Sequence, residues 1–136
     1  MTAISLDTGS LTPEQVDLLL KRLPADITYV DEHDEVRYYS GGDRIFTRMP
    51  VVIGHKVQQC HPPASIAKVQ EVIDAFRAGR KDEAEFWLKT QKRFVHIRYI
   101  AMRDGDGRYR GTLEVVQYAT VVRDFKVGKR LLEKRA

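Results

Sequence analysis

The stretch Val57-Gln58-Gln59-Cys60-His61-Pro62-Pro63 leads into the strongest helical pattern in the chain. Proline has a fixed φ and no N–H group, so Pro62-Pro63 suits the first turn of a helix, where backbone N–H groups lack partners. Across residues 64–78, apolar residues recur every three or four positions and form one stripe: Ile66, Val69, Val72, Ile73 and Phe76. Gly79 follows at the position where glycine commonly ends a helix. The single cysteine and one of the four histidines therefore stand together at the start of a buried helix.

Cys60 and His61 allow two interpretations, which the sequence leaves open. A cysteine thiolate and a neutral imidazole are both good ligands for zinc or haem iron, so the pair could face a ligand. Alternatively, His61 caps the helix or packs beside Pro62, and Cys60 is a small buried apolar residue. His55 would complete only a loose zinc set with this pair, because no second cluster of ligands accompanies it.

The composition describes an ordinary globular protein. The chain has 136 residues, of which 43% are hydrophobic and 31% are charged, so we expect one domain with a sizeable core. No run of about 18 apolar residues is present, and residues 1–10 lack the basic and apolar regions of a secretory signal. The single cysteine rules out an intrachain disulfide. These features predict a cytoplasmic protein without a membrane partner.

The chain is basic, with a net charge of +4 and a pI of about 9.3. Part of the excess lies near the C-terminus, at Arg123, Lys126, Lys129, Arg130, Lys134 and Arg135. Such a surface could bind nucleic acid weakly. No helix-turn-helix, zinc-finger or RNA-recognition pattern accompanies it. We therefore interpret it as a solvated helix face and do not expect nucleic acid as a partner.

A short helix is expected ahead of the main fold. Thr12 can cap this helix, Pro13 suits its first position, and Gln15 completes a capping box. Apolar residues continue at helical spacing until Pro24 ends the helix. We assign residues 1–23 to an N-terminal helical extension that packs on the sheet or on a second subunit.

The remaining pattern is that of β-strands. Five β-prone segments alternate with turns, at residues 27–30, 36–39, 83–90, 93–102 and 109–118. The last three are joined at hairpin spacing and predict an antiparallel meander. The order predicts an α+β fold, in which a five-stranded antiparallel sheet carries helices on one face and the N-terminal helix beside it. We assign residues 24–120 to this domain and residues 121–136 to a C-terminal connector.

Two blocks of sequence resemble PAS domains. The first pairs Ile27-Thr28-Tyr29-Val30-Asp31 with Val36-Arg37-Tyr38-Tyr39-Ser40 and resembles their opening strands. The second runs from Arg98 to Gln117 and resembles their closing hairpin. A more specific resemblance is to the C-terminal PAS sensor domain of bacterial and archaeal proteins that also carry a hemerythrin-like domain. It rests on Leu6-Asp7-Thr8-Gly9, Asp43-Arg44-Ile45-Phe46, Cys60-His61-Pro62-Pro63, Ala84-Glu85-Phe86-Trp87 and Arg130-Leu131-Leu132.

The resemblance implies a sensor or regulatory module that binds a small ligand, such as haem, between the long helix and the sheet. Some PAS domains hold haem there through an axial histidine from the helical region, which would be His61 here. Occupancy would be signalled through a homodimer or a partner signalling domain. The alternative is a ligand-free PAS domain that only dimerises or docks other proteins. PAS domains commonly close with Asp-Ile-Thr, where the aspartate anchors the exit strand, whereas this chain has Tyr118-Ala119-Thr120.

The candidate ligand-binding residues are His61, Cys60, His96, Phe76 and Met102. Phe76 belongs to the apolar stripe of the long helix. His96 and Met102 share one face of the strand at 93–102, which could contact a ligand or could lie at a dimer surface or a solvated sheet edge. His61 is also the candidate axial ligand of haem, and the cofactor is otherwise unknown. We expect no enzyme and no catalytic residues, because the chain lacks a P-loop, a nucleophile elbow and a dinucleotide fingerprint.

Overall fold

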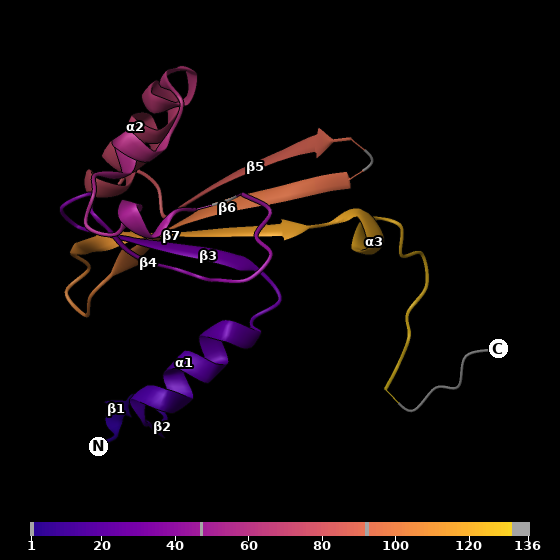
Figure 1. The fold of residues 1–136 in the computed structure, drawn as a ribbon, viewed down its shortest axis with the longest axis horizontal. Helices are drawn as coiled ribbons and strands as arrows, with labels where there is room; N and C mark the ends of the chain where they lie inside the picture. Colours follow the sequence, from indigo (N-terminus) through magenta and orange to yellow (C-terminus); the bar gives the residue numbers. More distant parts are fainter. Residues whose placement is uncertain (1, 47, 92, 132–136) are drawn as a thin grey trace.

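The computed structural model describes residues 2–46, 48–91 and 93–131 (Figure 1). The tail residues Leu132, Lys134 and Arg135, on which part of the sequence analysis rests, lie outside the described residues. Five strands form one antiparallel sheet: β3 (Asp26–Asp31), β4 (Val36–Tyr39), β5 (Glu83–Thr90), β6 (Arg93–Arg103) and β7 (Tyr109–Tyr118). Their order across the sheet is β4-β3-β7-β6-β5. The predicted α+β fold is therefore confirmed.

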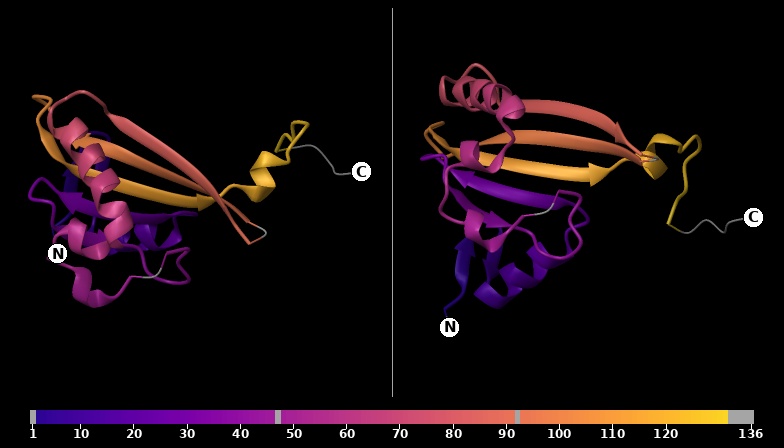
Figure 2. Two further views of the ribbon diagram at one scale, coloured as in Figure 1. Left: turned by 90° about the horizontal axis from the view of Figure 1, so that it is seen from above. Right: turned by 45° about the horizontal axis from the view of Figure 1, so that its top comes forward.

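The long helix α2 (Pro63–Arg77) lies across one face of the sheet (Figures 1 and 2). Pro62-Pro63 occupies the N-cap and the first helical position, as predicted. Gly79 follows the helix with a φ of 73°, and the Arg80 N–H group donates to the Ala75 carbonyl at 2.9 Å. This ending is a Schellman motif, which needs a positive φ that glycine adopts without strain.

The chain between β4 and α2 forms two 3₁₀ turns, η1 (Pro50–Val52) and η2 (Val57–Cys60). Two buried clusters hold the layers together. One joins η2 and α2 to the β3–β4 hairpin, through Val30, Val36, Val57 and Ile73. The other lies on the meander, at Val95, Ile97 and Val116.

The N-terminal segment begins with a small hairpin of β1 (Ile4–Leu6) and β2 (Gly9–Leu11), followed by α1 (Pro13–Arg22). The hairpin was not predicted. The capping box is confirmed, because the Gln15 N–H group donates to Thr12 Oγ1 at 3.1 Å and the Thr12 N–H group donates to Gln15 Oε1 at 2.9 Å. Helix α1 lies on the side of the sheet away from α2 (Figures 1 and 2). Neither α1 nor any other described helix is long and apolar enough to cross a membrane.

Strand β7 leads into the short helix α3 (Thr120–Arg123), and the junction is fastened to β6. The Ala119 N–H group donates to the Phe94 carbonyl at 2.8 Å, and the Phe94 N–H group donates to Thr120 Oγ1 at 2.8 Å. A threonine hydroxyl thus anchors the exit of this sheet. The described chain beyond α3 extends away from the sheet (Figure 1).

Candidate functional site

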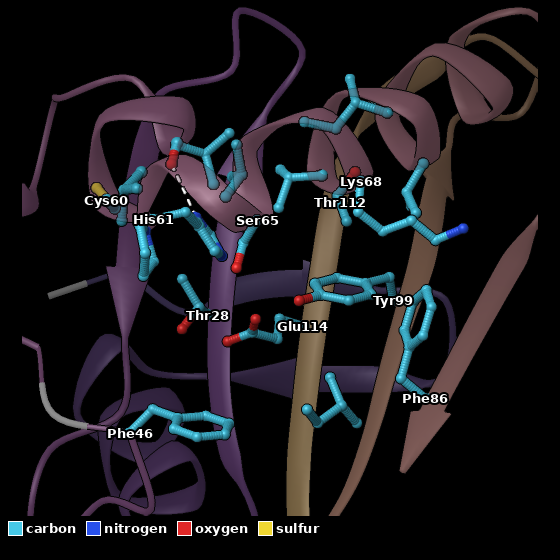
Figure 3. Close-up of a pocket in the computed structure, with 18 of the residues that line it drawn as sticks. Thr28, Phe46, Cys60, His61, Ser65, Lys68, Phe86, Tyr99, Thr112 and Glu114 are labelled. Carbon is cyan, nitrogen blue, oxygen red and sulfur yellow. Dashed lines mark hydrogen bonds between the residues drawn. The ribbon is translucent and has the colours of Figure 1, made fainter. Parts of the chain in front are cut away.

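A cavity of about 510 Å³ lies between α2 and the sheet (Figure 3). The loop before α2 closes one side of it, through Phe46, Arg48 and Val57. The volume falls within the range of about 300–1,000 Å³ that is usual for small-molecule sites. The space in which the sequence analysis places a ligand is therefore large enough for a small molecule.

One side of the sheet faces the cavity, and we call it the inner face. Its cavity-lining residues include Thr28 of β3, Ile97 and Tyr99 of β6, and Thr112 and Glu114 of β7. Helix α2 contributes the opposite wall, with Val69, Val72 and Ile73. Side chains alternate between the two sides of a strand, so the residues between the inner-face residues belong to the other side, which we call the outer face.

Three polar side chains meet beside the inner face, and we call them the polar cluster: Arg48, Tyr99 and Glu114. Arg48 Nη2 lies 3.3 Å from Glu114 Oε1, and the two side chains are only 14% and 9% exposed. Tyr99 is the cross-strand partner of Glu114, and both side chains line the cavity. Burial raises the pKa of Tyr99 well above its usual range, and the negative charge of Glu114 raises it further. Tyr99 therefore keeps its proton at neutral pH.

Two buried threonines flank the polar cluster. Arg44 Nη2 donates to Thr28 Oγ1 at 3.2 Å, and the Tyr109 hydroxyl lies 2.7 Å from Thr112 Oγ1. Each threonine is thus held by a partner that does not itself line the cavity. They add hydrogen-bonding capacity to the inner face without adding charge.

His61 stands at the mouth of α2, and its ring points toward the cavity (Figure 3). Its Nδ1 atom lies 3.0 Å from the Val57 carbonyl oxygen. A carbonyl only accepts hydrogen bonds, so Nδ1 must carry the proton. In the neutral ring, Nε2 is then unprotonated and can accept a hydrogen bond or bind a metal.

Cys60 also lines the cavity, and its thiol donates to the Lys56 carbonyl at 3.5 Å. Burial raises the pKa of this thiol, and the positive charge of Arg48 offsets only part of that effect. Cys60 is therefore a thiol rather than a reactive thiolate at neutral pH. In the part of the chain that the structure describes, no group of three or more histidine, cysteine or acidic residues could hold a metal ion. A zinc set built on this pair and His55 is not formed.

The other three predicted site residues do not line the cavity. His96 and Met102 are on the outer face of β6, where His96 Nε2 lies 2.6 Å from Glu85 Oε2 and Met102 is 39% exposed. Phe76 is fully buried in the core, one helical turn beyond Ile73. Their role in binding a ligand stays a prediction, and two choices made from the sequence explain why they lie outside the cavity. The prediction chose the more polar face of β6, and it followed the helix stripe past the end of the cavity.

The polar cluster was missed at the sequence level. Tyr99 and Glu114 could have been paired from the hairpin turn, but a bulge between Met102 and Arg103 shifts the register of β6 and β7. Arg48 lies in an irregular segment, where no periodic pattern indicates which way a side chain points. The available signal was a charged residue, Glu114, set among Leu113, Val115 and Val116 in a β-prone segment.

Comparisons with known proteins agree with this architecture. A PAS-domain family model matches residues 16–119. The crystal structure of a C-terminal domain from Streptococcus mutans is similar at a TM-score of 0.85 and 33% identity, covering 90% of this chain and 96% of that chain. A search of curated proteins finds no match.

More distant structures share the fold alone. The PAS domain of BvgS from Bordetella pertussis has a TM-score of 0.57 at 17% identity, covering 81% of this chain and 90% of that chain. A Vibrio cholera VqmA–ligand–DNA complex has a TM-score of 0.57 at 21% identity, covering 81% of this chain and 52% of that chain. The chain belongs to the PAS-domain family, whose fold is typical of sensory and regulatory modules and is generally not catalytic.

Proposed function

We propose that this PAS domain is a sensor that binds a small molecule in the cavity between α2 and the inner face. The observation that carries the proposal is the polar cluster beside a cavity with mostly apolar walls. A buried ion pair is weak as a source of stability, because removing two charges from water offsets most of their attraction. Its position against a cavity of this size supports a role in recognising a ligand.

The proposed signal passes from the cavity to the ends of the domain. A ligand can shift a protein between two conformations only if it binds them with different affinity. Tyr99 and Phe94 lie on the same strand, and Phe94 is fastened to Thr120 at the start of α3. Displacement of β6 by a ligand would therefore move the C-terminal connector. We further propose that a homodimer or a partner domain receives this movement, and the link to a hemerythrin-like domain stays a prediction.

The first experiment is to look for a ligand that the protein carries. The protein is purified, denatured and extracted, and the extract is compared by mass spectrometry with that of Glu114→Leu, which removes the carboxylate from the cavity. We expect a small molecule that accompanies the wild type and is depleted from the variant. Equal extracts, together with no thermal shift from a library of small molecules, would favour the ligand-free docking module instead.

Haem is a second candidate occupant, favoured by the His61 geometry alone. The Nδ1–H group is committed to the Val57 carbonyl, which leaves Nε2 as the one ring atom suited to iron. His61 would hold the haem, and the bound haem would supply a redox-active iron. Cys60 is the matched control, because it also lines the cavity but is held as a neutral thiol.

The haem proposal is tested by visible spectra of the protein with added haem. If haem occupies the cavity through His61, a Soret band appears in the wild type and in Cys60→Ala, and it shifts or disappears in His61→Ala. A band that is the same in all three proteins would exclude His61 as the ligand. The absence of any band would remove haem and leave the organic ligand.

A further inference from the structure

The polar cluster also indicates which kind of molecule the cavity accepts. We propose that the cavity selects uncharged, mainly apolar molecules that present a hydrogen-bond donor to Glu114, and that it rejects carboxylates. This inference rests on the proposed function, because it names the ligand class of the same site. Figure 3 shows Glu114, Tyr99, Thr28 and His61 directed toward a common space beneath α2.

Glu114 provides the first acceptor. Its carboxylate is 9% exposed, lies beside Tyr99 and is paired with Arg48, whose Nη2 lies 3.3 Å from Oε1. A carboxylate offers about four lone-pair positions, so these two neighbours do not exhaust its capacity to accept. An incoming N–H or O–H group can therefore join the cluster without displacing Arg48 or Tyr99.

Tyr99 and His61 provide two further acceptors. The Tyr99 hydroxyl borders the same space, and its oxygen can accept a hydrogen bond from a ligand. Burial raises the pKa of Tyr99, so the hydroxyl keeps its proton at neutral pH. When the His61 ring is neutral, Nδ1 donates to the Val57 carbonyl and Nε2 is left as an acceptor. Three lining groups from three separate elements thus offer lone pairs to the same space.

The cations near the cavity do not reverse this preference. Arg48 is paired with Glu114. Lys68 stands at the edge of α2 with a side chain that is 58% exposed, and its Nζ atom lies 3.5 Å from Glu71 Oε2. A carboxylate ligand would bring a second negative charge against Glu114 in a site of low dielectric, where repulsion is weakly screened. The oxygen atoms of the carboxylate would also face the acceptor atoms that line the cavity, and two acceptors cannot form a hydrogen bond with each other.

The walls favour a flat ring system. Phe86 and Tyr99 pack edge to face with ring centroids 5.9 Å apart, and both line the cavity together with Phe46. The opposite wall is aliphatic, from Val69, Val72 and Ile73 of α2. An aromatic ring can be held between these two surfaces. Indole is a suitable probe because it is flat, uncharged and apolar apart from one N–H donor.

The test is a calorimetric titration of the purified protein with indole, 1-methylindole and indole-2-carboxylate. The second probe has the same ring without the donor, and the third adds a negative charge. We expect indole to bind at least about tenfold more tightly than 1-methylindole, and indole-2-carboxylate not to bind measurably. Equal binding of indole and 1-methylindole, or tighter binding of the carboxylate, would overturn the ligand class while leaving the proposed function standing. Binding of none of the three would count against both.

Two variants sharpen the result, with a third as the matched control. Glu114→Gln keeps the size of the side chain and removes its charge, so indole should bind about tenfold more weakly and indole-2-carboxylate, no longer repelled, should now bind measurably. Tyr99→Phe keeps the Glu114 charge, so rejection of the carboxylate should persist even if Glu114→Gln fails to fold. Glu85→Gln makes the same chemical change on the outer face and should bind all probes as the wild type does. A carboxylate that binds Tyr99→Phe and the wild type well would contradict the proposal.

Discussion

Strand β6 has two faces that differ in chemistry, and the less polar one borders the cavity. On the inner face, Val95 and Ile97 are buried and Tyr99 reaches the polar cluster. On the outer face, His96 and Arg98 form ion pairs with Glu85 and Glu83 at 2.6 and 2.8 Å. The outer charges are satisfied by the neighbouring strand and by solvent, so they have no need of a ligand. A polar strand face is therefore a weaker sign of a binding site than a few polar groups buried among apolar ones.

The largest expected difference between core and outer face concerns stability. Phe76→Ala removes a fully buried ring and should lower the free energy of unfolding by about 3–5 kcal/mol. Met102→Ala truncates a side chain that is 39% exposed on the outer face, and it should change that free energy by about 0.5 kcal/mol or less. Urea unfolding of both variants measures the difference. Similar losses in the two variants would show that the outer face is covered in solution.

A smaller effect is expected from the inner-face hydroxyl. Tyr99→Phe removes a hydroxyl that lies beside the buried Glu114, and it should lower the free energy of unfolding by about 1 kcal/mol at neutral pH. The folded-state pKa of Tyr99 is raised above its ordinary value of 10.0, so the unfolded chain releases this proton first. The wild type should therefore lose stability as the pH rises above 10, and Tyr99→Phe should lose less over the same range.

Unfolding curves at a series of alkaline pH values test this prediction. The other tyrosines are present in both proteins, so the difference between the two curves isolates Tyr99. Parallel curves from neutral to alkaline pH would mean that the Tyr99 hydroxyl is not buried against Glu114.

The smallest effect is expected on the outer face. His96→Ala breaks an ion pair in which Glu85 is 51% exposed, and surface pairs of this kind contribute about 1 kcal/mol or less. We expect little change in thermal stability and no change in the affinity for indole. A loss of indole binding in His96→Ala would restore His96 as a ligand-binding residue and contradict the assignment of the two faces.

Much of the fold could be predicted because its signals are local. Pro62-Pro63 and Gly79 mark the ends of α2, and Thr12 with Gln15 marks the start of α1. The β1–β2 hairpin was missed because each strand has only three residues, too few to show an alternating pattern.

The candidate site was harder to predict because it depends on contacts between distant segments. Cys60 and His61 do line the cavity. This position could be predicted because both residues directly precede the helix that covers the sheet. The choice between the two faces of β6 depends on which side α2 covers, and alternation alone does not determine that side. Arg48 reaches Glu114 from a loop, so only the folded chain brings them together.

The central claim is that a small molecule binds on the inner face, beneath α2. Nuclear Overhauser contacts between indole protons and methyl groups of the protein test it most directly. The account predicts contacts to Val69 and Ile97, which line the cavity from opposite sides, and none to Ile100 and Met102 on the outer face. Contacts to Ile100 and Met102 instead, or no contact to either pair at saturating indole, would contradict it.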